Sequence, residues 1–279
     1  MSKIAIAQIK SSTDKSENLK LARKLIKDAK EKGGELVAFP EFLMAFSPAS
    51  QSAAALTQVA EKTDGAFVSS LREAAKASAI AVIATIYENC PVPNRVFDTA
   101  VFIDAHGNVA SIYRKLHLYD AFGFKESDKF HPGDDIAPLA SVGEHRFGMM
   151  ICYDLRFPEM ARMLTLAGAN ILIAPAGWVQ GDLKLEHWQT MIRARALENG
   201  CYVIAPAQVG NIYIGHSMAV DPLGRTLADL GDNEDMTIIE LDLSLLRETR
   251  EKLPLLQNRR TDVYARHMSR AKNSVGAIK

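Results

Sequence analysis

The sequence predicts an α/β protein that folds as one domain. Strand-like apolar runs alternate with segments whose apolar residues recur at helical spacing, from residue 3 to residue 241. The order of elements in the second half of the chain repeats the order in the first half. No stretch rich in Pro, Gly or Ser separates the two halves, so all 279 residues are expected to belong to a single domain.

The first half begins with an expected strand at residues 3–8. A helix follows, with Asp14 and Glu17 at capping-box spacing at its start and Gly33-Gly34 at its end. The residues Asp-Ala-His-Gly-Asn at 104–108 predict a hairpin. The other elements expected in this half are strands at 35–39, 80–87, 99–103 and 110–114 and a helix at 67–77.

The second half begins with an expected strand at 146–152, followed by a helix that has Pro158 at its start. A longer helix is expected at about 185–199, where Gly200 ends it. Asp-Pro-Leu-Gly at 221–224 predicts a second hairpin. The other expected elements are a helix at 158–167 and strands at 171–174, 202–205, 218–220, 226–227 and 236–241.

Composition excludes several classes of protein. Thirty-three Lys and Arg balance thirty-three Asp and Glu, which argues against a protein that binds nucleic acid or a membrane surface. No apolar run approaches the ~18 residues of a membrane span, and the N-terminus has no signal-peptide pattern. Three cysteines are too few for a disulfide framework. A cytoplasmic protein is the simplest interpretation.

The segment from Leu243 onward is more basic than the rest, with nine Lys or Arg and three acidic residues. We expect it to be solvated or packed against a partner. Nucleic-acid binding is disfavoured because Tyr264 is its only aromatic residue.

Cys152 is a candidate nucleophile because it follows an apolar strand and precedes the turn that opens the helix at Pro158. Such a turn leaves backbone N–H groups free to donate to an oxyanion, first among them that of Tyr153. A small buried hydrophobic role is the alternative. Cys90 and Cys201 lack this setting and are expected to be inert.

Two charged residues also lie where apolar strands end. Glu41 follows Leu-Val-Ala-Phe-Pro at 36–40 and is a candidate general base, with a turn or capping acid as the alternative. Lys115 follows Ser-Ile-Tyr-Arg at 111–114, and a buried ammonium there needs a carboxylate partner. A surface lysine is the alternative. Open α/β sheets place ligands at the carboxyl ends of their strands, where Glu41, Lys115 and Cys152 are expected to meet.

Three segments, in this order along the chain, carry a family resemblance: Phe-Pro-Glu-Phe at 39–42, Tyr-Arg-Lys-Leu-His at 113–117 and Ile-Cys-Tyr-Asp-Leu-Arg-Phe-Pro-Glu at 151–159. The sequence resembles the nitrilase, or carbon-nitrogen hydrolase, superfamily from residue 4 to residue 260. The resemblance implies a four-layer α-β-β-α sandwich, a Glu41–Lys115–Cys152 triad and no cofactor. It also implies a homodimer or larger homo-oligomer, with residues 243–279 as an arm at the interface.

The similarity is closest to the branch that includes deaminated glutathione amidase, through the segments 118–122, 125–127, 176–178, 186–188, 193–198 and 253–260. It implies cleavage of a small-molecule amide to acid plus ammonia through a cysteine thioester. It also implies that Glu126 supports the lysine and orients the substrate amide. The same triad serves nitrile and N-carbamoyl substrates, so both stay open.

A 2-oxo acid substrate carries a carboxylate, so a cation is expected in the pocket. Arg156 and Lys184 are candidates, although a structural pairing of Arg156 with Asp154 or Glu159 is favoured. Trp178 and Trp188 are candidates for the wall of the site, and the alternative for both is a place in the core.

Other chemistries are less well supported. Gly-His-Ser-Met-Ala at 215–219 approximates a serine-hydrolase motif, but the hairpin after it places Ser217 in a strand. His117 or His131 could pair with a cysteine, yet neither has a context that fixes its partner. Metal-binding and nucleotide-binding motifs are absent, so neither group is expected. A non-catalytic binding role would fit a chain that lacked the triad.

Overall fold

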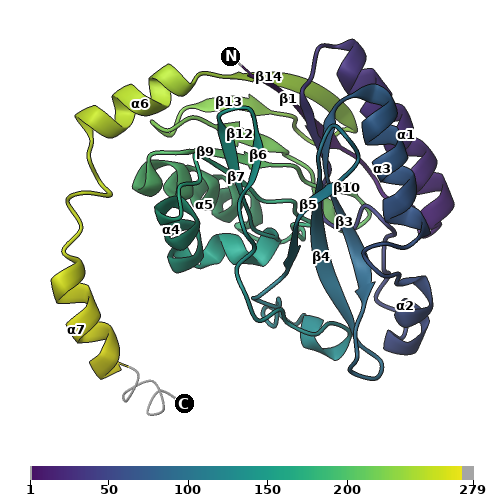
Figure 1. The fold of residues 1–279 in the computed structure, drawn as a ribbon. Coiled ribbons are helices and arrows are strands. Elements are labelled where there is room, and N and C mark those ends of the chain that lie inside the picture. The colour runs from purple at the N-terminus through teal and green to yellow at the C-terminus, as the bar shows by residue number, and fades with distance from the viewer. Residues whose placement is uncertain (1, 272–279) are drawn as a thin grey trace.

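A computed structural model describes residues 2–271 and shows four layers, α-β-β-α (Figure 1). Two six-stranded sheets face each other; α1 and α3 cover one sheet, and α4 and α5 cover the other (Figure 1). The helices are α1 (Lys15–Glu31), α2 (Ala53–Val59), α3 (Ala66–Ser78), α4 (Pro158–Leu166), α5 (Lys184–Asn199), α6 (Leu243–Lys252) and α7 (Thr261–Ala271). This confirms the predicted sandwich.

The first sheet has the order β14-β1-β2-β3-β4-β5, in which β1, β2 and β3 are parallel. The second has the order β13-β12-β9-β8-β7-β6, with β7, β8 and β9 parallel. The strands of the first sheet are β1 (Ser2–Gln8), β2 (Leu36–Ala38), β3 (Ala81–Asn89), β4 (Val96–Ile103), β5 (Val109–Arg114) and β14 (Asp235–Leu241). Those of the second are β6 (Ala140–Val142), β7 (His145–Met149), β8 (Ile171–Ile173), β9 (Tyr202–Ala205), β12 (Met218–Val220) and β13 (Thr226–Asp229), while β10 (Val209–Gly210) and β11 (Tyr213–Ile214) form a separate pair. The two halves therefore share one topology, as their order of elements predicts.

Alternation along the strands divides the apolar residues between two cores. In β1, Ile4 and Ile6 point into the core between the sheets, whereas Ala5 and Ala7 pack under α1 and α3. Across the inter-sheet core the rings of Phe102 and Phe147 lie 5.4 Å apart. The sheets are thus held face to face by side chains of both halves.

Several local features differ from the prediction. The halves interlock, because β14 from the end of the second half pairs antiparallel with β1. The helix α2 and the strand β6 were not predicted, since each is short and buries only one side chain. The expected capping box is not formed, although Asp14 caps α1. The N–H of Asp14 donates to the hydroxyl of Ser12, and this hydroxyl, rather than the Asp14 N–H, donates to the Glu17 carboxylate. Finally, β7 ends at Met149, so Cys152 lies in a turn rather than in the strand.

The C-terminal segment divides into a docked part and an exposed part. Arg250 in α6 donates to the carbonyls of Gly200 and Ala169, which fastens α6 to the second half. Beyond it, α7 lies away from the sandwich (Figure 1), and Tyr264 is exposed. Of the arm expected at 243–279, the part up to Lys252 is therefore docked on the second half, and residues 272–279 lie outside the described part. None of the helices within residues 2–271 has the length and apolar character needed to cross a membrane.

The role of the arm at an interface between copies stays a prediction. Removal of the residues after Gln257 should lower the molar mass measured by light scattering, because exposed groups of α7 would no longer cover a neighbouring copy. An unchanged oligomeric state would contradict an interface role for this segment.

Candidate active site

A buried ion cluster surrounds the ammonium of Lys115. Lys115 follows β5 directly, and its N–H donates to the carbonyl of Asp98 at 2.9 Å, which extends the pairing with β4. Its Nζ lies 2.8 Å from Glu41 Oε1, 2.8 Å from Glu126 Oε1 and 3.8 Å from Asp98 Oδ2. The side chain of Lys115 is only 2% exposed, so these carboxyl groups replace the water it has lost.

Glu41 connects this cluster to the second half of the chain. It lies three residues beyond β2 and is fully buried. Its Oε2 accepts a hydrogen bond of 2.5 Å from the backbone N–H of Gly177. A Cβ at residue 177 would come within 2.8 Å of the Phe42 ring, so glycine is the residue that lets this N–H approach.

Glu126 reaches Lys115 from a 3₁₀ turn, Glu126–Asp128. One carboxylate oxygen contacts Lys115, and the other accepts from the N–H of Tyr119 at 2.5 Å. Burial alone would lower the pKa of Lys115, but the charges of Glu126 and Glu41 outweigh it and hold that pKa well above its ordinary value. Burial raises the pKa of Glu126 against the opposing charge of Lys115.

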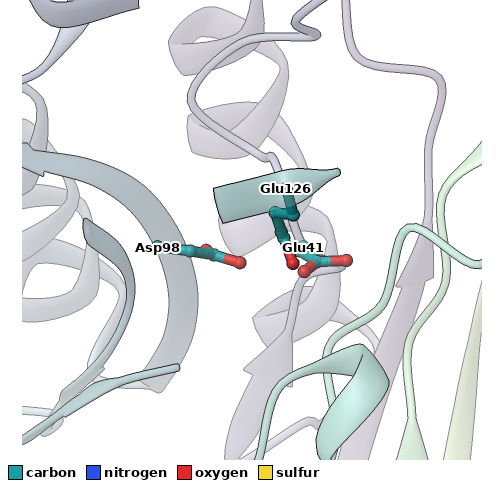
Figure 2. Close-up of side chains that lie close together, drawn as sticks. All are labelled: Glu41, Asp98 and Glu126. Carbon is teal, nitrogen blue, oxygen red and sulfur yellow. The ribbon is translucent and has the colours of Figure 1, made fainter. Parts of the chain in front are cut away.

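The carboxyl groups of Glu41, Asp98 and Glu126 converge (Figure 2), and an oxygen of each lies within 4.8 Å of the other two. Carboxylate oxygens are the ligands of hard cations such as Mg²⁺ and Ca²⁺. Here the Lys115 ammonium already lies at hydrogen-bond distance from two of them. A metal ion would have to displace that ammonium, so the cation that these carboxyl groups surround is Lys115.

Cys152 opens the second 3₁₀ turn, Cys152–Arg156, which leads into α4. Its φ is 45°, a left-handed conformation that is uncommon for a residue with a Cβ. Its backbone N–H donates to the carbonyl of Pro175 at 2.9 Å. These constraints hold the backbone of Cys152 in place at the start of the turn.

Asp154 holds this turn in place. The carboxylate is fully buried and accepts from the N–H of Ile151 at 2.8 Å and from the hydroxyl of Tyr113 at 2.6 Å. The ring of His117 lies 2.7 Å away through Nδ1. Because Tyr113 belongs to β5, the nucleophile turn of the second half is tied to the strand that precedes Lys115.

The thiol of Cys152 lies in the field of the ion cluster. Burial and then the negative charge of Glu41 raise the pKa of Cys152 well above its ordinary value, while the charge of Lys115 opposes them. The resting residue is therefore a thiol, and a nearby base has to accept its proton before it can attack.

A small pocket with about 240 Å³ of empty space opens at Cys152. Aromatic and cationic side chains dominate its lining. The lining residues are Tyr119, Cys152, Tyr153, Arg156, Gly177, Trp178, Val179 and Lys184. The structure thus brings Trp178, Lys184, Arg156 and Tyr153 to the candidate nucleophile.

The favoured pairing of Arg156 with Asp154 or Glu159 is wrong. The Asp154 carboxylate is occupied by other donors, and the guanidinium of Arg156 lies over the Trp178 ring at 4.8 Å. Within residues 2–271 it forms no ion pair, and its Nε is buried without a hydrogen-bond partner. A cation without a carboxylate partner therefore faces the pocket.

Lys184 is the second cation of the pocket. Its Nζ lies 2.5 Å from the Tyr119 hydroxyl and 3.9 Å from the centre of the Phe122 ring. Burial and then the charge of Arg156 lower the pKa of Lys184. In the described part of the chain, no carboxylate neutralises either cation.

Of the remaining candidates, only Trp178 lines the pocket. Trp188 packs against it in the core, and the centres of the two Trp rings are 5.2 Å apart. Ser217 is fully buried. Its hydroxyl accepts a hydrogen bond from the N–H of Ala207 and donates one to the carbonyl of the same residue. His117 is engaged by Asp154 and stacks on Phe157.

Several site residues were not predicted as such: Tyr119, Gly177, Asp98 and the supporting role of Asp154. Tyr119 and Gly177 lie in segments that carried the family resemblance. Asp98 gave no signal, since it comes just before the strand expected at 99–103, where an acid looks like a solvent-facing residue, whereas β4 begins at Val96 and includes it.

Comparison with known proteins agrees with this geometry. The family model for carbon-nitrogen hydrolases matches residues 3–251. The chain belongs to the carbon-nitrogen hydrolase family. This confirms the family that the three motifs predict.

Among curated relatives, the hydrolase is 38% identical over 244 residues to a deaminated glutathione amidase of Escherichia coli O157:H7, covering 88% of this chain and 92% of that protein. It is 32% identical to the rat deaminated glutathione amidase over 94% of this chain and 83% of that protein. Two solved structures share the fold. The nitrilase and Fhit fusion protein of Caenorhabditis elegans matches with a TM-score of 0.86 at 33% identity, over 94% of this chain and 66% of that one. A Nesterenkonia amidase matches with a TM-score of 0.78 at 26% identity, over 95% and 96%.

The buried Asp154 carboxylate should contribute strongly to stability. Asp154→Asn should lower the free energy of unfolding by about 3 kcal/mol, because an amide cannot accept all the hydrogen bonds that the buried carboxylate now accepts. Urea unfolding followed by circular dichroism measures this change. Asp64→Asn, at an exposed position, is the matched control, and an equal effect of both substitutions would contradict the role given to Asp154.

Proposed function

We propose that this hydrolase is an amidase that cleaves the amide of a small anionic substrate, deaminated glutathione or a related ω-amide of a 2-oxo acid. The observation that carries the proposal is the pocket itself. It joins a buried cysteine, next to the Glu41–Lys115 pair, with two cations that have no carboxylate partner in the described structure.

In the proposed first step, Glu41 takes the proton of the Cys152 thiol as the sulfur attacks the amide carbon. The negative charge on the former carbonyl oxygen is stabilised by the Lys115 ammonium and by the backbone N–H of Tyr153. Glu41 and Glu126 hold the Lys115 ammonium at 2.8 Å each before this charge appears, so the ammonium needs little reorganisation. One donor of this kind is typically worth on the order of 10²–10³ in rate.

In the second half of the reaction, Glu41 gives its proton to the departing nitrogen and a thioester forms on Cys152. Water then attacks the thioester carbon while Glu41 accepts a proton from it. The C–S bond breaks, the acid product leaves, and Glu41 returns the proton to the Cys152 sulfur. Glu126 keeps Lys115 in position throughout, through the contact of 2.8 Å. A primary ω-amide of a 2-oxo acid releases ammonia, as the resemblance implies. Deaminated glutathione differs, because its amide nitrogen belongs to the cysteinylglycine portion, which leaves as an amine. The acid product is therefore the readout that serves both substrates.

The anionic character of the substrate rests on Arg156 and Lys184. Two like charges in one small pocket repel each other, and the charge of Arg156 adds to burial in lowering the pKa of Lys184. A bound carboxylate would relieve this repulsion and supply the acceptor that the buried Nε of Arg156 lacks. The relatives named deaminated glutathione amidase support the same substrate class.

A Nesterenkonia relative supports the nucleophile. One of its structures carries the acetamide moiety of fluoroacetamide on the active-site cysteine. By analogy we assign the same role to Cys152.

Side-by-side assays test this assignment. The wild-type protein should form acid product from deaminated glutathione and 2-oxoglutaramate faster than from an N-carbamoyl amino acid or a simple nitrile, and Cys152→Ala should abolish turnover of all four. Acid product measured by chromatography is the common readout, and the circular dichroism spectrum checks the fold of the variant. Robust turnover by Cys152→Ala would overturn the mechanism; preference for the nitrile or the carbamoyl compound would overturn the substrate class.

Arg156→Met tests the recognition of an anion separately from the chemistry. Loss of a charged hydrogen-bond partner, worth about 1.5–3 kcal/mol, should raise KM for an anionic amide by roughly 10- to 100-fold with a smaller change in kcat. A neutral amide should lose much less. Arg247→Met, at an exposed position, is the matched control, and equal losses for the anionic and neutral amides would contradict the assignment.

A further inference from the structure

Asp98 is a buried carboxyl group beside the site that the proposed mechanism does not use. It lies in β4, where it pairs with Tyr87 of β3, and its side chain is 1% exposed. Figure 2 shows it pointing toward Glu41 and Glu126 from the opposite side of the cluster. Its Oδ2 is 3.8 Å from the Lys115 Nζ, beyond hydrogen-bond distance.

The hydrogen-bond donors in this cluster are unequally shared. Glu41 accepts from Lys115 and from Gly177 N–H, and Glu126 accepts from Lys115 and from Tyr119 N–H. Neither oxygen of Asp98 has a hydrogen-bond partner within residues 2–271. An ionised carboxylate without a donor is among the most costly groups to bury, whereas a neutral carboxyl is far less so.

The charges lead to the same conclusion. Three ionised carboxylates around one ammonium would leave two uncompensated negative charges in a buried site. One proton on the group that lacks donors removes one of these charges and leaves the Glu41 and Glu126 contacts to Lys115 intact. A neutral Asp98 also has an O–H that can donate to a neighbouring carboxylate.

We infer that Asp98 carries a proton in the resting enzyme and acts as a positioning residue that limits the negative charge around Glu41 and Lys115. This inference rests on the proposed function only for its effect on turnover. With Asp98 neutral, Lys115 retains more of its positive field for the oxyanion, and the Cys152 thiol loses its proton more easily. Ionisation of Asp98 weakens both.

The groups that face Asp98 from the surrounding elements are Glu41 after β2, Tyr87 on β3, Lys115 after β5 and Glu126 in its 3₁₀ turn. Burial and then the charge of Glu41 raise the pKa of Asp98 well above its ordinary value, with Lys115 opposing. The Tyr87 hydroxyl donates to the carbonyl of Ala45. Lys115 is thus the only one of these facing groups that favours the ionised form.

The sign of the pH effect on stability follows from the tighter binding of the proton in the folded state. The unfolded chain releases the Asp98 proton near pH 4, and the folded chain releases it at higher pH. The wild type therefore loses stability, relative to a variant that cannot ionise, as pH rises through this window. The difference Tm(Asp98→Asn) minus Tm(wild type) should become more positive from about pH 5 to about pH 9.

The stability test has its control and its contrary outcome in the same experiment. Asp64→Asn should show a difference from wild type that does not change over this range. A flat or falling difference for Asp98→Asn would mean that Asp98 is already ionised in the folded protein, and would overturn the inference.

Infrared spectroscopy of the wild type at pH 7 gives a measurement that does not depend on how a variant folds. The spectrum should contain the C=O band of a protonated carboxyl group, and that band should disappear in Asp98→Asn but persist in Asp64→Asn. Absence of the band from the wild type, or its full retention in Asp98→Asn, would overturn the inference.

Kinetics then test the effect on catalysis. The ratio of kcat/KM for Asp98→Asn to that for the wild type should rise with pH, because only the wild type acquires the additional negative charge. A ratio independent of pH would overturn the positioning role. If no amide is turned over at all, the proposed function fails, while the stability and infrared results still decide whether Asp98 holds a proton.

Discussion

The rest of the site depends on the burial of one ammonium, that of Lys115. Removing a charge from water is so unfavourable that it is tolerated only where opposite charges surround it closely. Glu41 and Glu126 meet this requirement at 2.8 Å each. The same contacts hold the two carboxylates in fixed positions, so the arrangement that neutralises the lysine also aligns a candidate base and a candidate oxyanion donor beside Cys152.

The second constraint is that the site is assembled from both halves of the sandwich. The Lys115 cluster comes from the first half, whereas Cys152 and Gly177 come from the second. The contacts that join them are hydrogen bonds with buried acceptors: Gly177 N–H to Glu41, and the Tyr113 hydroxyl to Asp154. Because the sheets pack through an interdigitated core, a shift of one sheet against the other would break these contacts together. The packed core between the sheets therefore keeps the site residues of the two halves at fixed distances from one another.

The α/β class and most elements could be predicted because their signals are local, and three local motifs carried the resemblance that implies the four-layer sandwich and the three candidate catalytic residues. Cys152, for example, follows an apolar run and precedes a helix that begins with Pro158. The supporting residues could not be predicted in this way. Asp154 meets Tyr113 across 41 positions of sequence, Lys184 meets Tyr119 across 65, and Gly177 meets Glu41 across 136. Arg156 also shows that local sequence is not enough. Acids near it in the sequence suggested an ion pair, but in the fold the carboxylate of Asp154 accepts hydrogen bonds from other donors.

Charge is distributed in opposite ways on the two sides of Cys152, and this bears on how an anionic substrate could be handled. Around Lys115 the carboxyl groups outnumber the ammonium, whereas the pocket that Cys152 lines carries Arg156 and Lys184. The two cations should attract an anion, and the carboxyl groups around Lys115 should repel it. Its carboxylate end would stay with the cations while its amide end, which is neutral, reaches the sulfur. Neutral Asp98 moderates this asymmetry, because an additional negative charge behind Cys152 would also oppose the negative charge that develops on the substrate oxygen during attack.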